Sequence, residues 1–143
     1  MRNRVWLIIA MSLLGLLVYS GLGPLNMHGV ECGMTKSEVR RRLGEPAPSE
    51  GMWVYYFGLL VAGAEFLGMD FGPDGRVKAL YGEQICRGWR PVVGVGDTEE
   101  AVVREFGPVK RRTADGQVVT CLFEQLEVSL AENRVLQIKL LAK

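Results

Sequence analysis

Histidine is almost missing from this 143-residue chain, since His28 is the only one. A Ser/His/Asp or Cys/His site needs an imidazole base, and His28 lies beside an apolar N-terminal segment. Three cysteines and one histidine do not make a recognisable zinc site, and the glycine-rich stretches lack the lysine of a phosphate loop. We therefore predict no catalytic residue, no metal, no cofactor and no enzymatic activity. Thiol chemistry of an unrecognised kind is the one enzymatic alternative.

An excess of charge of either sign is also missing. The formal net charge is +1, so removing Arg2 and Arg4 from the count leaves −1 for the rest of the chain. The basic clusters at 40–42 and 110–112 have acidic residues nearby, which is typical of a solvated face. A nucleic-acid-binding domain is expected to carry a basic patch, so we predict no nucleic-acid partner.

The N-terminal segment is apolar and carries no charge after Arg2 and Arg4 until position 31. Such a segment is either a cleaved signal peptide or a single transmembrane anchor, and we assign residues 1–25 to it. We favour the anchor, in which residues 5–23 cross the membrane and the positive-inside rule places the remainder outside the cytoplasm. The alternative is cleavage near Ser20, which would leave a periplasmic or secreted protein.

Cysteine is scarce, and export changes what the three cysteines can do. Cys121 lies in the apolar run VVTCLF and is expected to be buried as a small hydrophobic residue. Cys32 and Cys86 fall in expected loops, and in an oxidising compartment they could form a disulfide. Three reduced thiols are the alternative.

A helix-forming pattern occurs twice, first as GMTKSEVRRRLGEP from position 33. Thr35 and Glu38 have the spacing of a capping box, in which each side chain accepts a backbone N–H of the other residue. Gly44 suits the left-handed position that ends a helix. The stretches MWVYYFG, AEFLGMDF and RVKALYG then predict three strands in an antiparallel meander.

The second occurrence, GDTEEAVVREFGP from position 96, is weaker. Asp97 or Thr98 caps the helix and Gly107 ends it, but Ala101 stands where the capping box has Glu38. The stretches QVVTCLF, QLEVSLA and VLQIKLLA predict three further strands.

These two copies predict an α+β fold of two tandem units, at 30–82 and 83–143, each a helix plus a three-stranded antiparallel meander. An N-terminal hydrophobic helix precedes them. A unit of this size buries too little surface to be stable alone, so we expect the two to pack together. The connector between the two copies, residues 82–95, is too apolar for a flexible tether. Its Trp89 either plugs the junction between the copies or contacts a partner.

Strand alternation predicts which side chains face a partner. Leu126, Val128 and Leu130 alternate with polar residues and are expected to face the core. By the matching register, Tyr56 and Phe66 point to the opposite face, where they could form an exposed aromatic interaction patch. The alternative is that the neighbouring copy or the N-terminal segment covers them. The candidate partner-binding residues are Tyr56, Phe66 and Trp89.

The first copy resembles the SmpA/OmlA/BamE-like domain family over residues 33–80. The match lies in the motif G-M-T-K-x-E-V-x-x-x-L-G-E-P, followed by W-V-Y-Y and F-G-P-D-G-R-V. The resemblance implies a small exported module that helps envelope or outer-membrane assembly. The tandem arrangement is also similar to β-lactamase inhibitory proteins, which are secreted binders. Cys32 is preceded by Gly29-Val30-Glu31 and not by a lipobox, so lipid attachment there is not expected.

The sequence therefore predicts an exported, membrane-anchored, non-enzymatic module that binds a protein partner in the cell envelope. A freely secreted or periplasmic inhibitor-like binding protein is the alternative.

Overall fold

The computed structural model describes residues 23–58 and 65–143, and the predicted leader at 1–25 lies almost wholly outside these ranges. The described elements are β1 (Leu25–Asn26), α2 (Lys36–Leu43), β2 (Trp53–Phe57), β3 (Glu65–Phe71), β4 (Val77–Gly82), β5 (Gln84–Arg87), β6 (Arg90–Gly94), α3 (Glu99–Phe106), β7 (Arg111–Asp115), β8 (Val118–Leu122), β9 (Leu126–Ala131) and β10 (Arg134–Leu141). No helix within the described ranges has the length and apolar character needed to cross a membrane.

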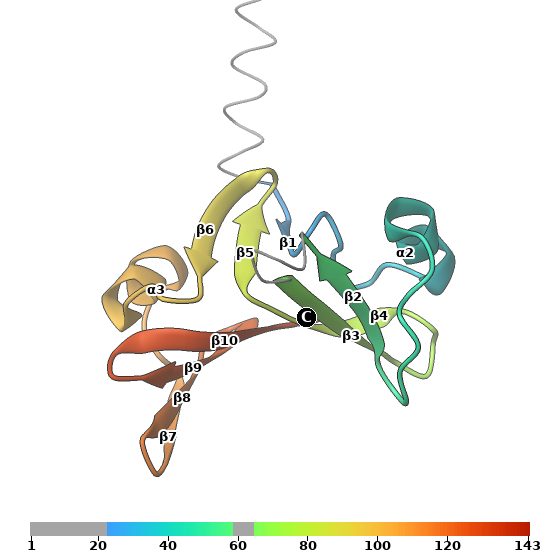
Figure 1. Cartoon of the computed structure of the whole chain (residues 1–143). Helices are drawn as coiled ribbons and strands as arrows, with labels where there is room; N and C mark the ends of the chain where they lie inside the picture. The colour runs from blue at the N-terminus through green and yellow to red at the C-terminus, as the bar shows by residue number, and fades with distance from the viewer. Residues whose placement is uncertain (1–22, 59–64) are drawn as a thin grey trace, which may run out of the picture.

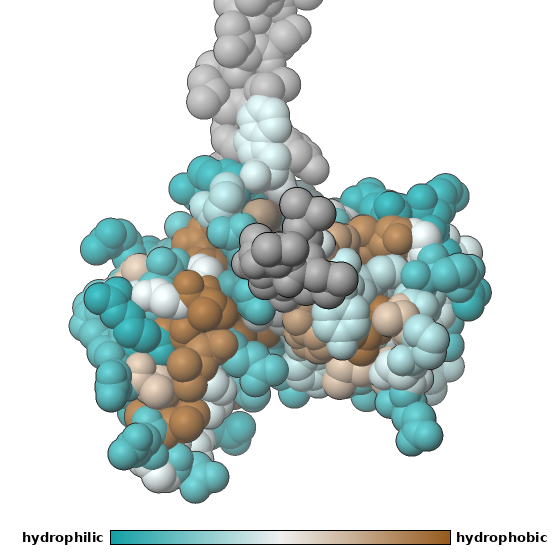
Figure 2. Space-filling model, in the orientation of Figure 1, coloured by the Kyte–Doolittle hydropathy of each residue, from teal (hydrophilic) through white to brown (hydrophobic). Residues whose placement is uncertain are grey.

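One antiparallel sheet of seven strands runs through the molecule in the order β2-β3-β4-β10-β9-β8-β7. Its centre is the pairing of β4 with β10, in which Leu80 lies opposite Leu140 and Gly82 lies opposite Ile138. The first and second halves of the chain therefore share backbone hydrogen bonds and do not merely touch. Figure 1 shows β10, β9, β8 and β7 below α3 and a second, smaller sheet, whereas β2 stands level with β1 and α2. In the same view, Figure 2 shows hydrophobic residues gathered in a band over the half of the molecule that holds α3 and β7–β10.

The predicted α+β fold of two helix-plus-meander units is wrong, because residues 23–58 and 65–143 are mostly β, with two sheets and two short helices of eight residues each. The connector between the copies forms β5 and β6, and β5 pairs with both β1 and β6 in a separate three-stranded sheet. The second half also contains an unpredicted strand, β7. All five β7 residues are exposed, so no alternation of apolar and polar residues marks the strand, and it is defined by its backbone pairing with β8.

One face of the seven-stranded sheet forms the hydrophobic core. Leu126, Val128 and Leu130 are buried, as their alternation predicts, and Cys121 beside them is buried too. The small sheet contributes Ile85 and Val93 to the same cluster, and the helices contribute Val39 and Val102. The further buried members of the cluster are Met27, Val30, Tyr55, Leu67, Met69, Val77, Leu80, Phe123, Val135, Ile138 and Leu140. Both helices and the small sheet thus cover the same side of the large sheet (Figure 1).

The helix starts follow the predicted chemistry. At α2 the Thr35 hydroxyl accepts the Glu38 N–H at 3.3 Å, and the Glu38 carboxylate accepts the Thr35 N–H at 2.7 Å. At α3 the Thr98 hydroxyl accepts the Ala101 N–H at 3.3 Å, with no side chain to return the bond. Cap residues Gly44 and Gly107 follow the helices with φ of 81° and 82°, in the left-handed region that glycine tolerates.

Candidate protein-binding face

The large sheet has a second face that the described helices and the small sheet leave uncovered. Tyr55, on the core face, donates its hydroxyl to the Gly44 carbonyl at the end of α2 at 2.9 Å. Its neighbour Tyr56 has the opposite parity and is 64% exposed. We call this uncovered side of the seven-stranded sheet the open face.

Tyr56 and Phe66 form an aromatic patch at one end of the open face. They are direct partners in the β2–β3 register, and their ring centroids lie 6.2 Å apart in a tilted arrangement. Phe66 and Met52 both lie over Gly68: a Cβ added there would come within 2.8 Å of Phe66 Cζ and 2.9 Å of Met52 Sδ. The absence of a side chain at Gly68 therefore lets these two side chains cover β3.

A polar cluster adjoins this patch in the middle of the open face. The Tyr81 hydroxyl donates to Asp70 Oδ2 at 2.9 Å, and Lys139 Nζ lies 5.2 Å from the centroid of the Tyr81 ring. Burial, and next the hydrogen bond to Asp70, raise the pKa of Tyr81, so its hydroxyl stays protonated and can donate. With Lys78 and neighbouring residues these side chains line a shallow hollow of about 410 Å³.

The sequence-based reasoning did not identify Asp70, Tyr81 or Lys139. They come from β3, β4 and β10, and only the β4–β10 register places Tyr81 opposite Lys139. The alternation of β3 and β4 was the available signal, but it does not say which strand pairs with which.

Trp89 does not join the aromatic patch. It lies in the turn between β5 and β6, which belong to the small sheet on the other side of the molecule. The prediction that Trp89 plugs the junction is wrong, because the side chain is 55% exposed. The junction is instead filled by the β4–β10 pairing and by Met27, whose Sδ would lie 2.9 Å from a Cβ at Gly82.

The three cysteines are free thiols in the structure, so Cys32 and Cys86 are not joined. Cys32 Sγ donates to the Leu140 carbonyl at 3.7 Å, whereas Cys86 lies in β5 opposite Asn26 and Pro91. The expectation that Cys86 occupies a loop is therefore wrong as well, because the connector is a hairpin.

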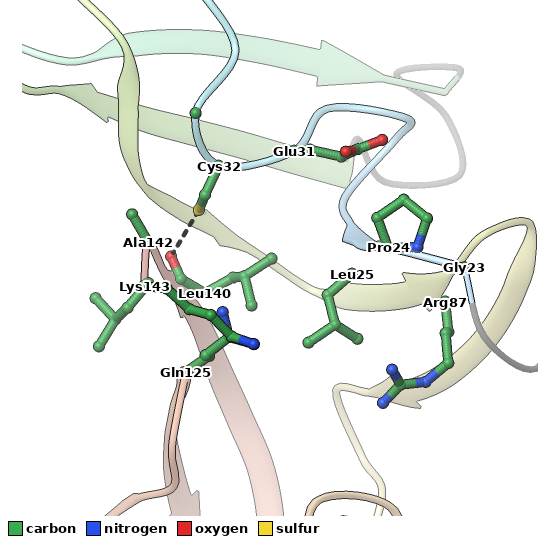
Figure 3. Close-up of a pocket in the computed structure, with 12 residues that line it drawn as sticks. Gly23, Pro24, Leu25, Glu31, Cys32, Arg87, Gln125, Leu140, Ala142 and Lys143 are labelled. Carbon is green, nitrogen blue, oxygen red and sulfur yellow. Dashed lines mark hydrogen bonds between the residues drawn. The ribbon is translucent and has the colours of Figure 1, made fainter. Parts of the chain in front are cut away.

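A second hollow, of about 500 Å³, lies where the N-terminal segment, β5 and the end of β10 meet. Figure 3 shows Leu25, Arg87, Gln125 and Leu140 around it, with Cys32 pointing to the Leu140 carbonyl. Burial raises the pKa of the Cys32 thiol to about 11, so the thiol is protonated near neutral pH and is a poor nucleophile. Arg87 is already paired with Glu105 at 3.3 Å.

Within residues 23–58 and 65–143 no three His, Cys, Asp or Glu side chains are grouped so that they could hold a metal ion. His28 instead stacks on Phe57 with ring centroids 3.9 Å apart, and its Nε2 lies 3.2 Å from Glu65 Oε2. The imidazole thus holds the segment around His28 against the β2–β3 end of the sheet.

No protein-family model and no curated protein matches the chain. Among solved structures, the chain is similar to the crystal structure, at 2.13 Å resolution, of a DUF4309 family protein (YjgB) from Bacillus subtilis subsp. subtilis str. 168. The TM-score is 0.56 at 19% sequence identity, over 88% of this chain and 90% of that one. At this identity the similarity concerns the fold alone.

Proposed function

We propose that the chain is an exported, non-enzymatic protein-binding module, held at the membrane by its leader and contacting its partner through the open face. The observation that carries this proposal is the Tyr56–Phe66 pair. Tyr56 is 64% exposed and lies tilted against Phe66 on the neighbouring strand, and no other layer of the described chain covers it. Aromatic residues and methionine are enriched in protein interfaces.

The chemistry of the open face suits a protein partner better than a small ligand. The aromatic patch of Tyr56 and Phe66, with Met52 beside it, offers apolar area. The two aromatic side chains stand on paired strands and have few rotatable bonds, so little side-chain entropy is lost on binding. The adjacent Asp70–Tyr81–Lys139 cluster offers donors and acceptors that fix the orientation of a partner. The hollow at this cluster is open and shallow, whereas small-molecule sites enclose most of their ligand.

Membrane attachment rests on the leader. Its two arginines followed by an uncharged apolar segment favour a single-pass anchor, with the β-rich domain outside the cytoplasm. The resemblance to SmpA/OmlA/BamE-like domains supports a role in envelope assembly, with a protein of the cell envelope as the partner. A released periplasmic or secreted inhibitor-like binder would use the same open face.

The binding proposal can be tested by site-specific photocrosslinking in cells of the native host. A photoreactive phenylalanine replaces Tyr56 in one full-length variant and Arg41, an exposed residue of α2 on the covered side, in the control. We expect one defined protein adduct from position 56, none from position 41, and loss of the adduct when Phe66→Lys is added. Equal adducts from both positions, or adducts insensitive to Phe66→Lys, would refute the open face as the binding surface.

Leader processing is measured on the same material. An anchored chain stays with membranes after an alkaline carbonate wash, and N-terminal sequencing finds it uncleaved, beginning at Met1 or at Arg2. A mature N-terminus near Gly21 in the soluble fraction would instead establish the released form.

A further inference from the structure

The turn between β5 and β6 lies beside the point where the leader joins the described chain. The Gly88 N–H donates to the Pro24 carbonyl at 3.0 Å, and Asn26 Nδ2 donates to the Gly88 carbonyl at 2.7 Å. Leu25 lies opposite Arg87 in the β1–β5 register. Figure 1 shows β1 next to this hairpin, so the described chain begins beside the hairpin and not beside the large sheet.

The turn carries an exposed tryptophan between two arginines. Gly88, with φ of 61°, occupies the first central position of a two-residue turn, which leaves Trp89 at the tip with 55% of its surface exposed. Arg87 and Arg90 flank the tip and share one carboxylate, that of Glu105, at 3.3 Å and 3.5 Å. Two guanidinium groups with one carboxylate leave a net positive charge at the tip.

We propose that this turn rests in the phospholipid headgroup layer of the membrane that holds the leader, with the Trp89 ring at the interface and Arg90 on lipid phosphates. This inference rests on the membrane anchoring proposed above. Tryptophan favours the membrane–water interface because its ring is apolar and its N–H is polar, and arginine binds phosphate through its fork of N–H donors.

The chain between the leader and the hairpin is short enough to allow this contact. Tyr19 ends the strongly apolar part of the leader, and only five peptide units separate it from Pro24. Fully extended, these span about 17 Å, and any bend in the chain shortens the distance. The headgroup layer adds about 5–7 Å beyond the hydrocarbon, so the hairpin tip reaches this layer when the linker is folded to less than half of its extended length. The length of the linker therefore permits the contact, and the chemistry of the turn favours it.

A single tryptophan and one net charge would bind a vesicle weakly as independent groups. The covalent leader changes this, because it holds the turn at a high effective concentration next to the lipid surface, and a weak contact then suffices to orient the domain. The small sheet lies against the core side of the large sheet through Ile85 and Val93. With the turn on the membrane, the open face therefore points away from the lipid, where a partner in the compartment can reach it.

The test uses tryptophan fluorescence of the full chain in vesicles of phosphatidylcholine and phosphatidylglycerol. Subtracting the emission spectrum of the Trp89→Phe variant from that of the unchanged chain gives the emission of Trp89. The same subtraction with a Trp6→Phe variant gives the emission of Trp6, which lies in the leader. Quenching is measured with iodide in the water and with lipids that carry a nitroxide either near the headgroup or deep in the acyl chain. Trp53, which packs against Phe71, is left in place in every sample.

We expect Trp89 emission to move to shorter wavelength in vesicles, to be quenched more by the shallow nitroxide than by the deep one, and to be shielded from iodide. Lipid quenching of Trp6 together with full iodide access to Trp89 would overturn the headgroup contact and leave the anchor intact. If neither tryptophan were quenched by lipid nitroxides, both the contact and the proposed anchoring would be wrong.

Discussion

The substitution Ile138→Ala tests whether the seven-stranded sheet joins both halves of the chain into one cooperative unit. Ile138 is fully buried in β10 and lies opposite Gly82 of β4 and Val128 of β9. Removing its side chain leaves a cavity at the junction, where little can move to fill it, because its neighbours come from strands fixed on both sides. Substitutions of this type cost about 2–5 kcal/mol of unfolding free energy.

Amide hydrogen exchange followed by mass spectrometry measures this cost separately in each half. If the sheet opens as one unit, amides in the centres of β3 and β9 exchange faster by the same factor. The factor is roughly 30-fold at the low end of the range and several thousand-fold at the high end, since about 1.4 kcal/mol is tenfold. Leu136→Ala is the control, because Leu136 is half exposed in the same strand and its truncation is expected to change stability by about 0.5 kcal/mol or less.

Faster exchange in β9 with unchanged exchange in β3 would refute the reasoning. It would mean that the halves unfold separately and that the β4–β10 pairing contributes little to the stability of the first half.

Further predictions concern the two faces of the sheet, the first helix and the buried thiol. Gly82→Ala should lower the unfolding free energy by about 1–3 kcal/mol in chemical denaturation, because the new Cβ meets the fully buried Met27 Sδ. Gly68→Ala should cost less, because the new Cβ meets the half-buried side chains of Phe66 and Met52, which can move outwards on the open face. Thr35→Ala should cost about 1 kcal/mol. The hydrogen bonds from Thr35 lower the pKa of Glu38, so its contribution to stability is present above the unfolded-state pKa and is lost as pH falls through the folded-state pKa. Thr35→Ala removes the hydroxyl bond to Glu38 but keeps the backbone bond, which is the larger cause, so it should make that part of a stability–pH profile shallower without abolishing it. Cys32, with its pKa raised to about 11, should react with iodoacetamide near neutral pH much more slowly than a model thiol, and a fast reaction would contradict its burial.

The local structure was accessible from the sequence because its causes are local. Thr35 and Glu38 lie three residues apart, which is the distance that a capping box requires. The alternation of Leu126, Val128 and Leu130 likewise identifies their shared face, because side chains along a strand alternate between its two faces. The same rule placed Tyr56 and Phe66 on one face, where the structure pairs them directly.

The architecture was not accessible in this way, because it depends on pairings between residues far apart in sequence. Nothing in the local pattern of β4 or β10 says that Tyr81 meets Lys139, yet this pairing merges the halves into one sheet and creates the polar cluster of the open face. The apolar composition of the connector indicated that it is not a flexible tether. Only its pairing with Leu25–Asn26 makes it part of a separate sheet, with Trp89 exposed in its turn. Alternation and capping, which act over a few residues, were therefore decided by the sequence itself. Strand order and the direction in which each exposed side chain points were decided by backbone hydrogen bonds that form only when the whole core assembles.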